Sequence, residues 1–107
     1  KDLPAPKIEE LLPKNQDAAT TVRALRKALP IVKRIGTRPD EELEQEIVSI
    51  ANEMGIKING IFMPIRVAVT GSTVSPPLFD SIRLLGLDTA LLRLERAVTI
   101  LSHQMGN

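Results

Sequence analysis

Arg66 is the side chain in this sequence that is best placed to recognise a ligand. It stands inside an otherwise apolar run, residues 64–69, that ends just before Gly71. A guanidinium group is costly to bury without a partner. We therefore expect one of two arrangements: a buried carboxylate such as Asp80 or Glu95 neutralises Arg66, or the arginine points outward at a ligand.

The six residues that follow Gly71 form a stiff, polar segment. Three of the residues from Ser72 to Pro77 carry hydroxyl groups and two are prolines. Proline fixes its backbone torsion, so this loop has little conformational entropy to lose on binding. A fixed cation beside such a loop predicts a recognition surface, and neither feature supplies a catalytic group.

The residue types that catalysis and metal binding need are scarce. The chain has no cysteine and a single histidine, His103, near its C-terminal end. A multi-histidine metal site therefore lacks the histidines it needs, and a Ser/His/Asp triad would depend on this one histidine near the chain end. The carboxylates between Asp40 and Glu46 stand where a helix is expected to start, and there they complement the helix dipole and are solvated. We expect no catalytic residue, metal site or cofactor site in this chain.

The recognition surface makes nucleic acid a candidate partner. The chain has only two aromatic residues, Phe62 and Phe79, too few for the stacking platform of common single-strand binders. Arg66, however, can offer two parallel donors to the acceptor atoms of an unpaired base, and the loop after Gly71 adds hydroxyl and amide donors. From the residues alone, an RNA contact and an internally paired arginine both remain open.

Charge is unevenly distributed along the chain. The net charge of the whole is +1, but residues 1–37 carry +4, residues 38–55 carry −5 and residues 56–107 carry +2. The pattern allows a basic face for an anionic partner and an acidic face turned away from it, although solvated helix surfaces would give the same pattern.

At 107 residues the chain has the length of one ordinary domain. Residues 1–15 contain three prolines, which predicts a linker packed on the body with one or two helical turns. A helix is expected to begin after Asp17, to be kinked or split at Pro30 and to stop at Gly36. The longest apolar run is short and the N-terminus lacks a hydrophobic signal region, so we expect neither a membrane-spanning nor a secreted protein.

Further along, a second helix is expected from Pro39 to a C-cap at Gly55, followed by a connector at residues 56–60 that buries two isoleucines. Helices are then expected at residues 61–69, with Pro64 near the first turn, at residues 78–85 and at residues 88–102. The predicted fold is all-α, a compact bundle of about five short helices, with a body at residues 16–102 and a flexible tail at residues 103–107.

Several motifs of this sequence are similar, in the same order along the chain, to the C-terminal end of bacterial-type glutamyl-tRNA synthetase, which is a glutamate–tRNA ligase. They are Pro64-Ile65-Arg66-Val67-Ala68-Val69-Thr70-Gly71, Ser75-Pro76-Pro77-Leu78-Phe79-Asp80, Leu84-Leu85-Gly86 and Arg93-Leu94-Glu95, and upstream Asp17-Ala18-Ala19-Thr20-Thr21 and residues 41–60. The resemblance covers nearly the whole chain. It departs from the family at Arg38-Pro39, where a Trp-Thr pair is frequent, and this leaves open the angle at which the acidic helix begins.

The resemblance implies an all-helical anticodon-binding subdomain of a class I aminoacyl-tRNA synthetase, a cytoplasmic, ATP-dependent enzyme of protein biosynthesis. It implies that Arg66 reads an anticodon base of glutamate tRNA, and that the corner formed by Ser75, Pro76, Pro77 and Leu78 contacts the anticodon loop. We name Arg83 and Arg93 as candidates for sequence-independent contacts with tRNA phosphates.

The family's His-Ile-Gly-His and Lys-Met-Ser-Lys type motifs are absent from this sequence. The chain therefore resembles a fragment without a catalytic site, in which residues 1–15 lead from an upstream helical subdomain. Glutamate, ATP and magnesium would be bound by the N-terminal catalytic domain of the intact enzyme.

Two other classes of protein are kept as alternatives. Residues 47–55 followed by residues 56–69 imitate a helix-turn-helix unit, but Pro64 interrupts the would-be recognition helix, which is also apolar, so no DNA partner is expected. The other alternative is a helical protein-interaction module that buries an exposed stripe of leucine and isoleucine side chains.

Overall fold

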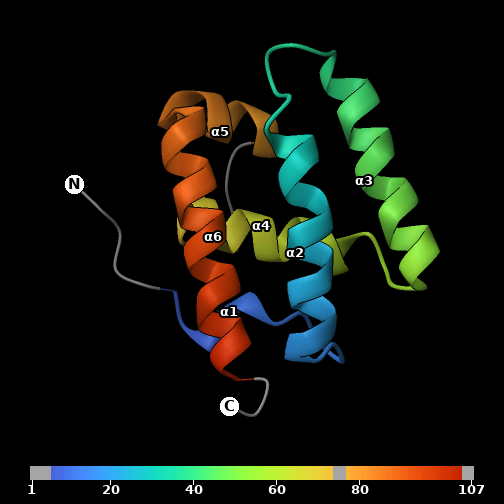
Figure 1. Cartoon of the computed structure of the whole chain (residues 1–107), viewed down its shortest axis with the longest axis vertical. Coiled ribbons are helices and arrows are strands. Elements are labelled where there is room, and N and C mark those ends of the chain that lie inside the picture. Colours follow the sequence, from blue (N-terminus) through green and yellow to red (C-terminus); the bar gives the residue numbers. More distant parts are fainter. Residues whose placement is uncertain (1–5, 74–76, 105–107) are drawn as a thin grey trace.

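The computed structural model describes residues 6–73 and 77–104, and these fold into six helices (Figure 1). The helices are α1 (Ile8–Leu11), α2 (Ala18–Val32), α3 (Asp40–Met54), α4 (Asn59–Thr70), α5 (Leu78–Leu85) and α6 (Leu87–His103). Within these ranges there is no β-strand, only an isolated bridge between Ile35 and Arg38. The predicted all-α bundle is confirmed, and α1 is the short helix that the proline-rich start of the chain permits.

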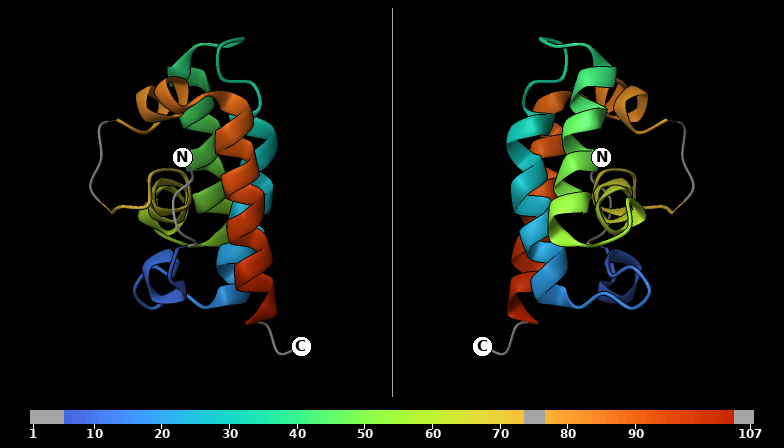
Figure 2. Two further views of the ribbon diagram at one scale, coloured as in Figure 1. Left: turned by 90° about the vertical axis from the view of Figure 1, so that its left-hand side faces the viewer. Right: turned by 90° about the vertical axis from the view of Figure 1, so that its right-hand side faces the viewer.

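The helices form two layers. In one layer α2 packs between α3 and α6, and the three run side by side (Figure 1). Figure 2 shows α4 nearly end-on against one face of this layer, with α1 and α5 on the same side. Because α4 contacts each of the other helices, it is the centre of the fold.

The central position of α4 explains its composition. Its mean hydropathy is high because most of its circumference is covered, and its buried residues are Gly60, Ile61, Pro64, Ile65, Val67, Ala68 and Val69. The half-buried residues Phe62, Arg66 and Thr70 recur at intervals of four, which places them on one stripe of the helix. Arg66 therefore lies on the side of α4 that faces solvent.

Pro64 produces a contact that fixes the start of α2 on α4. Proline has no N–H, so the carbonyl of Gly60, four residues earlier, lacks its helical donor. The side-chain amide of Gln16 donates to this carbonyl at 2.8 Å and to Thr21 Oγ1 at 2.9 Å. A Cβ at position 60 would lie 2.4 Å from Gln16 Oε1. Glycine is thus the residue that lets the turn before α2 approach α4.

Several predicted boundaries are confirmed. Asp17 caps α2 through a hydrogen bond that its side chain accepts from the Thr20 amide at 2.9 Å. Gly55 ends α3 in the left-handed conformation, at φ 69°. Helix α5 lies between Pro77 and Gly86, as expected.

Three local predictions are wrong. Helix α2 runs unbroken through Pro30 and ends at Val32 rather than at Gly36. Pro30 lies in the last turn, and the carbonyl it leaves without a donor belongs to the exposed Arg26, where water can serve as the partner. Helix α4 begins at Asn59, so Pro64 is in its second turn, and Ile58 of the connector is 46% exposed rather than buried.

Candidate nucleic-acid interface

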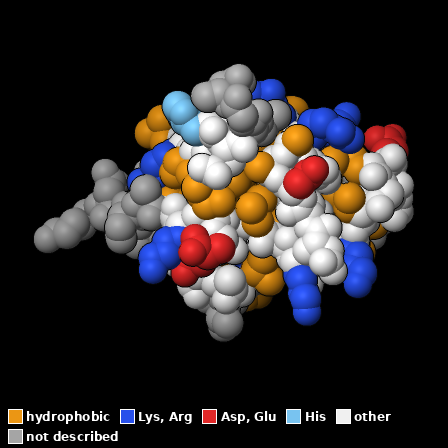
Figure 3. All heavy atoms as spheres, turned by 90° about the horizontal axis from the view of Figure 1, so that it is seen from below, with side chains coloured by type: hydrophobic (Ala, Val, Ile, Leu, Met, Phe, Trp, Pro, Cys, Tyr) orange, Lys and Arg blue, Asp and Glu red, His pale blue; other side chains and the backbone are white. Residues whose placement is uncertain are grey.

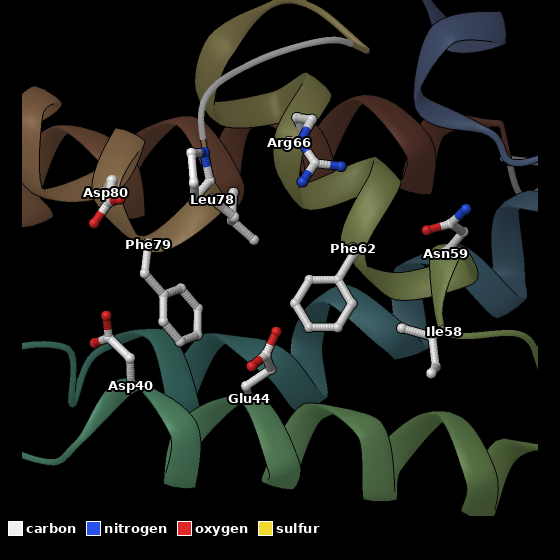
Figure 4. A pocket seen from close by; sticks show the side chains of 10 residues that line it. Asp40, Glu44, Ile58, Asn59, Phe62, Arg66, Leu78, Phe79 and Asp80 are labelled. Carbon is white, nitrogen blue, oxygen red and sulfur yellow. The ribbon is translucent and has the colours of Figure 1, made fainter.

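A cavity of about 390 Å³ opens between α3, α4 and α5, and we call it the Arg66 pocket. Its lining residues are Asp40, Glu44, Ile58, Asn59, Phe62, Arg66, Pro77, Leu78, Phe79 and Asp80. In Figure 4 the guanidinium group of Arg66 projects from α4 into the cavity, beside the Phe62 ring and facing the start of α5. Three consecutive helices meet here.

The backbone that carries Arg66 is held by packing. Ile65 is fully buried, and Val67 and Val69 are each only 1% exposed. Arg66 itself is half-buried, so its aliphatic stem is covered while its head reaches the cavity. The packing of its apolar neighbours thus anchors the arginine.

The two acids that the sequence suggested as buried partners for Arg66 do not lie in the core. Asp80 and Glu95 are exposed, and Asp80 Oδ1 accepts a hydrogen bond from Arg83 at 2.8 Å. In the described part of the chain the buried polar residues are Thr21 and Ser81, and neither is an acid. The Arg66 guanidinium is therefore directed to a cavity with charged walls rather than into the core.

The acidic segment does not turn away from Arg66. Asp40 and Glu44, both from α3, line the same cavity, and Asp80 lines it from α5. These residues do not form the acidic face turned away from the recognition surface that the charge pattern allowed, because the first turns of α3 and α5 are brought together across the mouth of the pocket. The result is one arginine among three carboxylates.

Arg83 joins the two acidic helix starts. Its guanidinium donates to Asp80 Oδ1 at 2.8 Å, and its Nη2 also contacts Asp40 Oδ2. The hydrogen bond with Asp40, aided by the charges of both carboxylates, raises the pKa of Arg83 above its ordinary value. In this structure Arg83 thus fixes the rim of the Arg66 pocket.

Arg93 makes a different internal contact. From α6 its Nη1 donates to the carbonyl of Val69 at 2.7 Å, in the last turn of α4. Carbonyls at that end have no helical donor, and a cation there also complements the helix dipole. Arg93 is half-buried and stabilises the end of the helix that carries Arg66.

The proline-rich corner reaches the pocket in the part that is described. Pro77 is exposed and Leu78 is 5% exposed, and both line the cavity. Ser75 and Pro76, which the sequence also pointed to, lie outside the described residues. The predicted proximity of Arg66 to this corner therefore holds for Pro77 and Leu78.

Sequence reasoning did not assign six of the lining residues to the pocket: Asp40, Glu44, Ile58, Asn59, Phe62 and Phe79. Phe62 lies one helical turn before Arg66, so its spacing of four was a usable signal. Phe79, Asn59 and Glu44 gave no such signal, since their proximity to Arg66 depends on how the helices pack. In Figure 4 the rings of Phe62 and Phe79 both project from their helices toward α3.

Two further findings concern the described residues alone. They contain no group of three or more histidine, aspartate or glutamate side chains arranged to hold a metal ion. Nor does any helix among them have both the length and the apolar character needed to cross a membrane.

Comparison with known families identifies the class of protein to which this small helical bundle belongs. Residues 4–98 match the family described as the anticodon binding domain. The chain therefore belongs to the anticodon binding domain family.

Its relatives are glutamate–tRNA ligases. The chain is 41% identical over 93 residues to that of Treponema denticola, which covers 87% of this chain and 18% of the relative. It is 40% identical over 94 residues to that of Roseiflexus castenholzii, covering 88% of this chain and 18% of the relative. The enzyme of Acidothermus cellulolyticus is 43% identical over 86 residues, covering 79% and 16%. The chain thus spans about a fifth of the length of the curated relatives it matches, and the resemblance to this family is confirmed.

Proposed function

We propose that this chain is the C-terminal anticodon-reading part of a cytoplasmic glutamate–tRNA ligase. The family match and the identity of about 40% to such ligases support the proposal. ATP, magnesium and glutamate are then bound by the N-terminal catalytic domain of the intact enzyme. The division into a linker at residues 1–15, a body at residues 16–102 and a tail at residues 103–107 stays a prediction.

The observation that carries the proposal is the direction of Arg66. The arginine extends from a rigid helix into a cavity that it shares with two aromatic rings and with the Pro77-Leu78 corner. A flat ring offers a surface for an unstacked base, and a guanidinium fork can pair with the acceptor atoms at the edge of that base. One anticodon base seated here would have its edge against Arg66.

The acidic rim favours a base over a phosphate in this pocket. Three carboxylates line it beside Arg66, and Arg83 pairs with two of them at the rim, so a phosphate group would meet three negative and two positive side chains at close range. A neutral base carries donors as well as acceptors on its edge, and it can use both kinds of partner. We infer that Arg66 reads a base and that Glu44 can accept from an amino group of the same base.

Substitution of Arg66 in the intact enzyme tests the proposal. Arg66→Ala is expected to reduce discrimination between the cognate anticodon and altered ones by about 1–3 kcal/mol, the worth of a two-pronged base contact. This is roughly 5- to 150-fold in the ratio of kcat/KM values. Arg66→Lys keeps the charge but loses the fork, and should recover little of the discrimination.

The matched control is Arg26→Ala, which removes an exposed arginine of α2. Circular dichroism of each variant checks that the helices persist. If Arg66→Ala charges altered tRNAs in the same ratio as the unchanged enzyme, Arg66 does not read a base. If the variant unfolds, Arg66 has a structural role instead.

The helix-turn-helix alternative is not supported by the structure. Its would-be recognition helix is α4, which contacts every other helix and is the most enclosed element of the fold. A recognition helix must enter a DNA groove, and α4 cannot do so without unfolding the bundle. A protein-interaction role would have to use the exposed Leu84 and Leu92, and nothing in the structure identifies a partner for them.

A further inference from the structure

A second cavity, of about 460 Å³, lies on the other side of Asn59 from the Arg66 pocket. Two lysines, Lys14 and Lys57, line it together with the side-chain amides of Asn15, Gln16 and Asn59. We call it the lysine pocket. Its lining contains no carboxylate, in contrast to the Arg66 pocket.

The charges of the two lysines are not compensated inside the molecule. Both side chains are exposed, and within residues 6–73 and 77–104 neither forms an ion pair or a side-chain hydrogen bond. Several arginines differ in this respect, since Arg34, Arg38 and Arg83 each contact a carboxylate. An anion that reaches the lysine pocket meets positive charge from two sides.

The two lysines come from separate turns that the fold holds together. Lys14 lies in the turn before α2, which Asn15 closes in the left-handed conformation at φ 65°. Lys57 lies in the connector after Gly55. The hydrogen bond from Gln16 to the Gly60 carbonyl joins the first turn to the start of α4, 44 residues away in sequence. The pairing of the lysines thus depends on the carbonyl that Pro64 leaves without a donor.

The lysine pocket and the Arg66 pocket adjoin each other near the start of α4. Asn59 lines both of them. Asn59 and Arg66 are seven residues apart, which is two helical turns or about 10 Å along the axis. At the rise of about 3.4 Å per nucleotide of a helical strand, this corresponds to two or three nucleotides.

From this placement we propose that the lysine pocket binds the phosphodiester backbone of an RNA strand, two or three nucleotides from the one whose base enters the Arg66 pocket. The proposal rests on the proposed function, because it takes the strand that Arg66 reads to be the one that continues across Asn59. Lysine is a flexible point charge, suited to a phosphate and indifferent to base identity. The side-chain amides of Asn15 and Asn59 can add donors for the phosphate oxygens, whereas that of Gln16 already donates to Thr21 and to the Gly60 carbonyl.

Figure 3 views the lower end of the molecule, where the sole histidine marks the last turn of α6. Lysine and arginine side chains stand around its edge, with acidic, hydrophobic and neutral ones among them. Charges of both signs are therefore distributed over this end, and a test of the lysine pocket needs a control that removes the same charge elsewhere.

The test measures how tRNA binding by the intact protein depends on salt. The Lys14→Gln/Lys57→Gln double variant removes two charges from the pocket, and the Lys27→Gln/Lys33→Gln control removes two exposed charges from α2 and its C-cap. For single strands each neutralised phosphate contributes about −0.7 to the slope of log K against log salt. The pocket variant should flatten the slope by about 0.7 to 1.4, equally for cognate tRNA and for tRNA with an altered anticodon.

A slope change no larger than that of the control overturns the proposal, as does a loss of binding confined to the cognate anticodon. Inorganic phosphate, titrated at constant ionic strength, separates a backbone site from a site for a free anion. If phosphate and tRNA shield both lysines equally from chemical modification while the salt slope stays unchanged, that result assigns the pocket to the free anion and overturns the proposal. A flattened slope that remains in the Arg66→Ala protein supports the phosphate site even if Arg66 proves not to read a base.

Discussion

The contact between Gln16 and Gly60 leads to a quantitative prediction about stability. Gln16→Ala removes both hydrogen bonds of the side-chain amide and leaves the carbonyl of Gly60, a buried residue, without a partner. A buried acceptor left unsatisfied costs about 1–3 kcal/mol. The free energy of unfolding should fall by that amount, although Gln16 itself is only half-buried.

A second substitution distinguishes this mechanism from a simple loss of packing. Pro64→Ala restores an N–H four residues after Gly60, so the helix can supply the donor that Gln16 supplies in the unchanged protein. In that background Gln16→Ala should cost only its bond to Thr21, about 0.5–1.5 kcal/mol. The two substitutions should therefore be coupled by roughly 1 kcal/mol.

Urea unfolding of the four proteins, followed by circular dichroism, measures the coupling. The slopes of free energy against urea should agree among the four, since the same surface is exposed on unfolding. Additivity of the two single effects to within about 0.5 kcal/mol would refute the reasoning. In that case Gln16 acts by filling space, and Pro64 does not determine how the turn before α2 docks.

Two further predictions concern helix ends. The hydrogen bonds that Asp17 accepts from Thr20 lower its pKa below the ordinary 3.8, so its stabilising effect is complete above that value and is lost as the pH falls through the folded-state pKa. Asp17→Asn keeps the cap but should make urea stability less sensitive to acid, and an unchanged acid sensitivity would contradict this. Gly55→Ala places a Cβ at φ 69° and should cost about 1–2 kcal/mol in urea unfolding, and Gly55→Asn less, because asparagine tolerates the left-handed region. Equal stability of all three residues at position 55 would show that the helix ends elsewhere.

The features that the sequence predicted are those with local causes. A proline before helix α3, acids in its first turn and a glycine after it predict the bounds of this helix. Each of these residues acts within a few positions of its own. The anchoring of Arg66 followed from the apolar residues beside it. The same local rule failed at Pro30, because a proline in the last turn leaves a carbonyl that water can reach.

The features that could not be predicted depend on packing between distant segments. No spacing in the sequence indicates that Asp40 and Glu44 face Arg66, since α3 and α4 are separated by a connector whose path is set by the core. The internal contacts of Arg83 and Arg93 have the same origin. The sequence suggests that both arginines are available for tRNA phosphates, whereas in the structure each of them stabilises the end of a helix.

The acidic rim and the lysine pocket together determine how a strand would lie on α4. Coulomb energy at close range is larger for a phosphate than for a neutral base, so the backbone should avoid the three carboxylates around Arg66 and settle near Lys14 and Lys57. With the backbone held two turns away, a base would be the part of the strand that reaches Arg66. The lysine pocket would then supply affinity, and Arg66 would supply base choice. The acidic residues of α3 would contribute to specificity by repelling the phosphates.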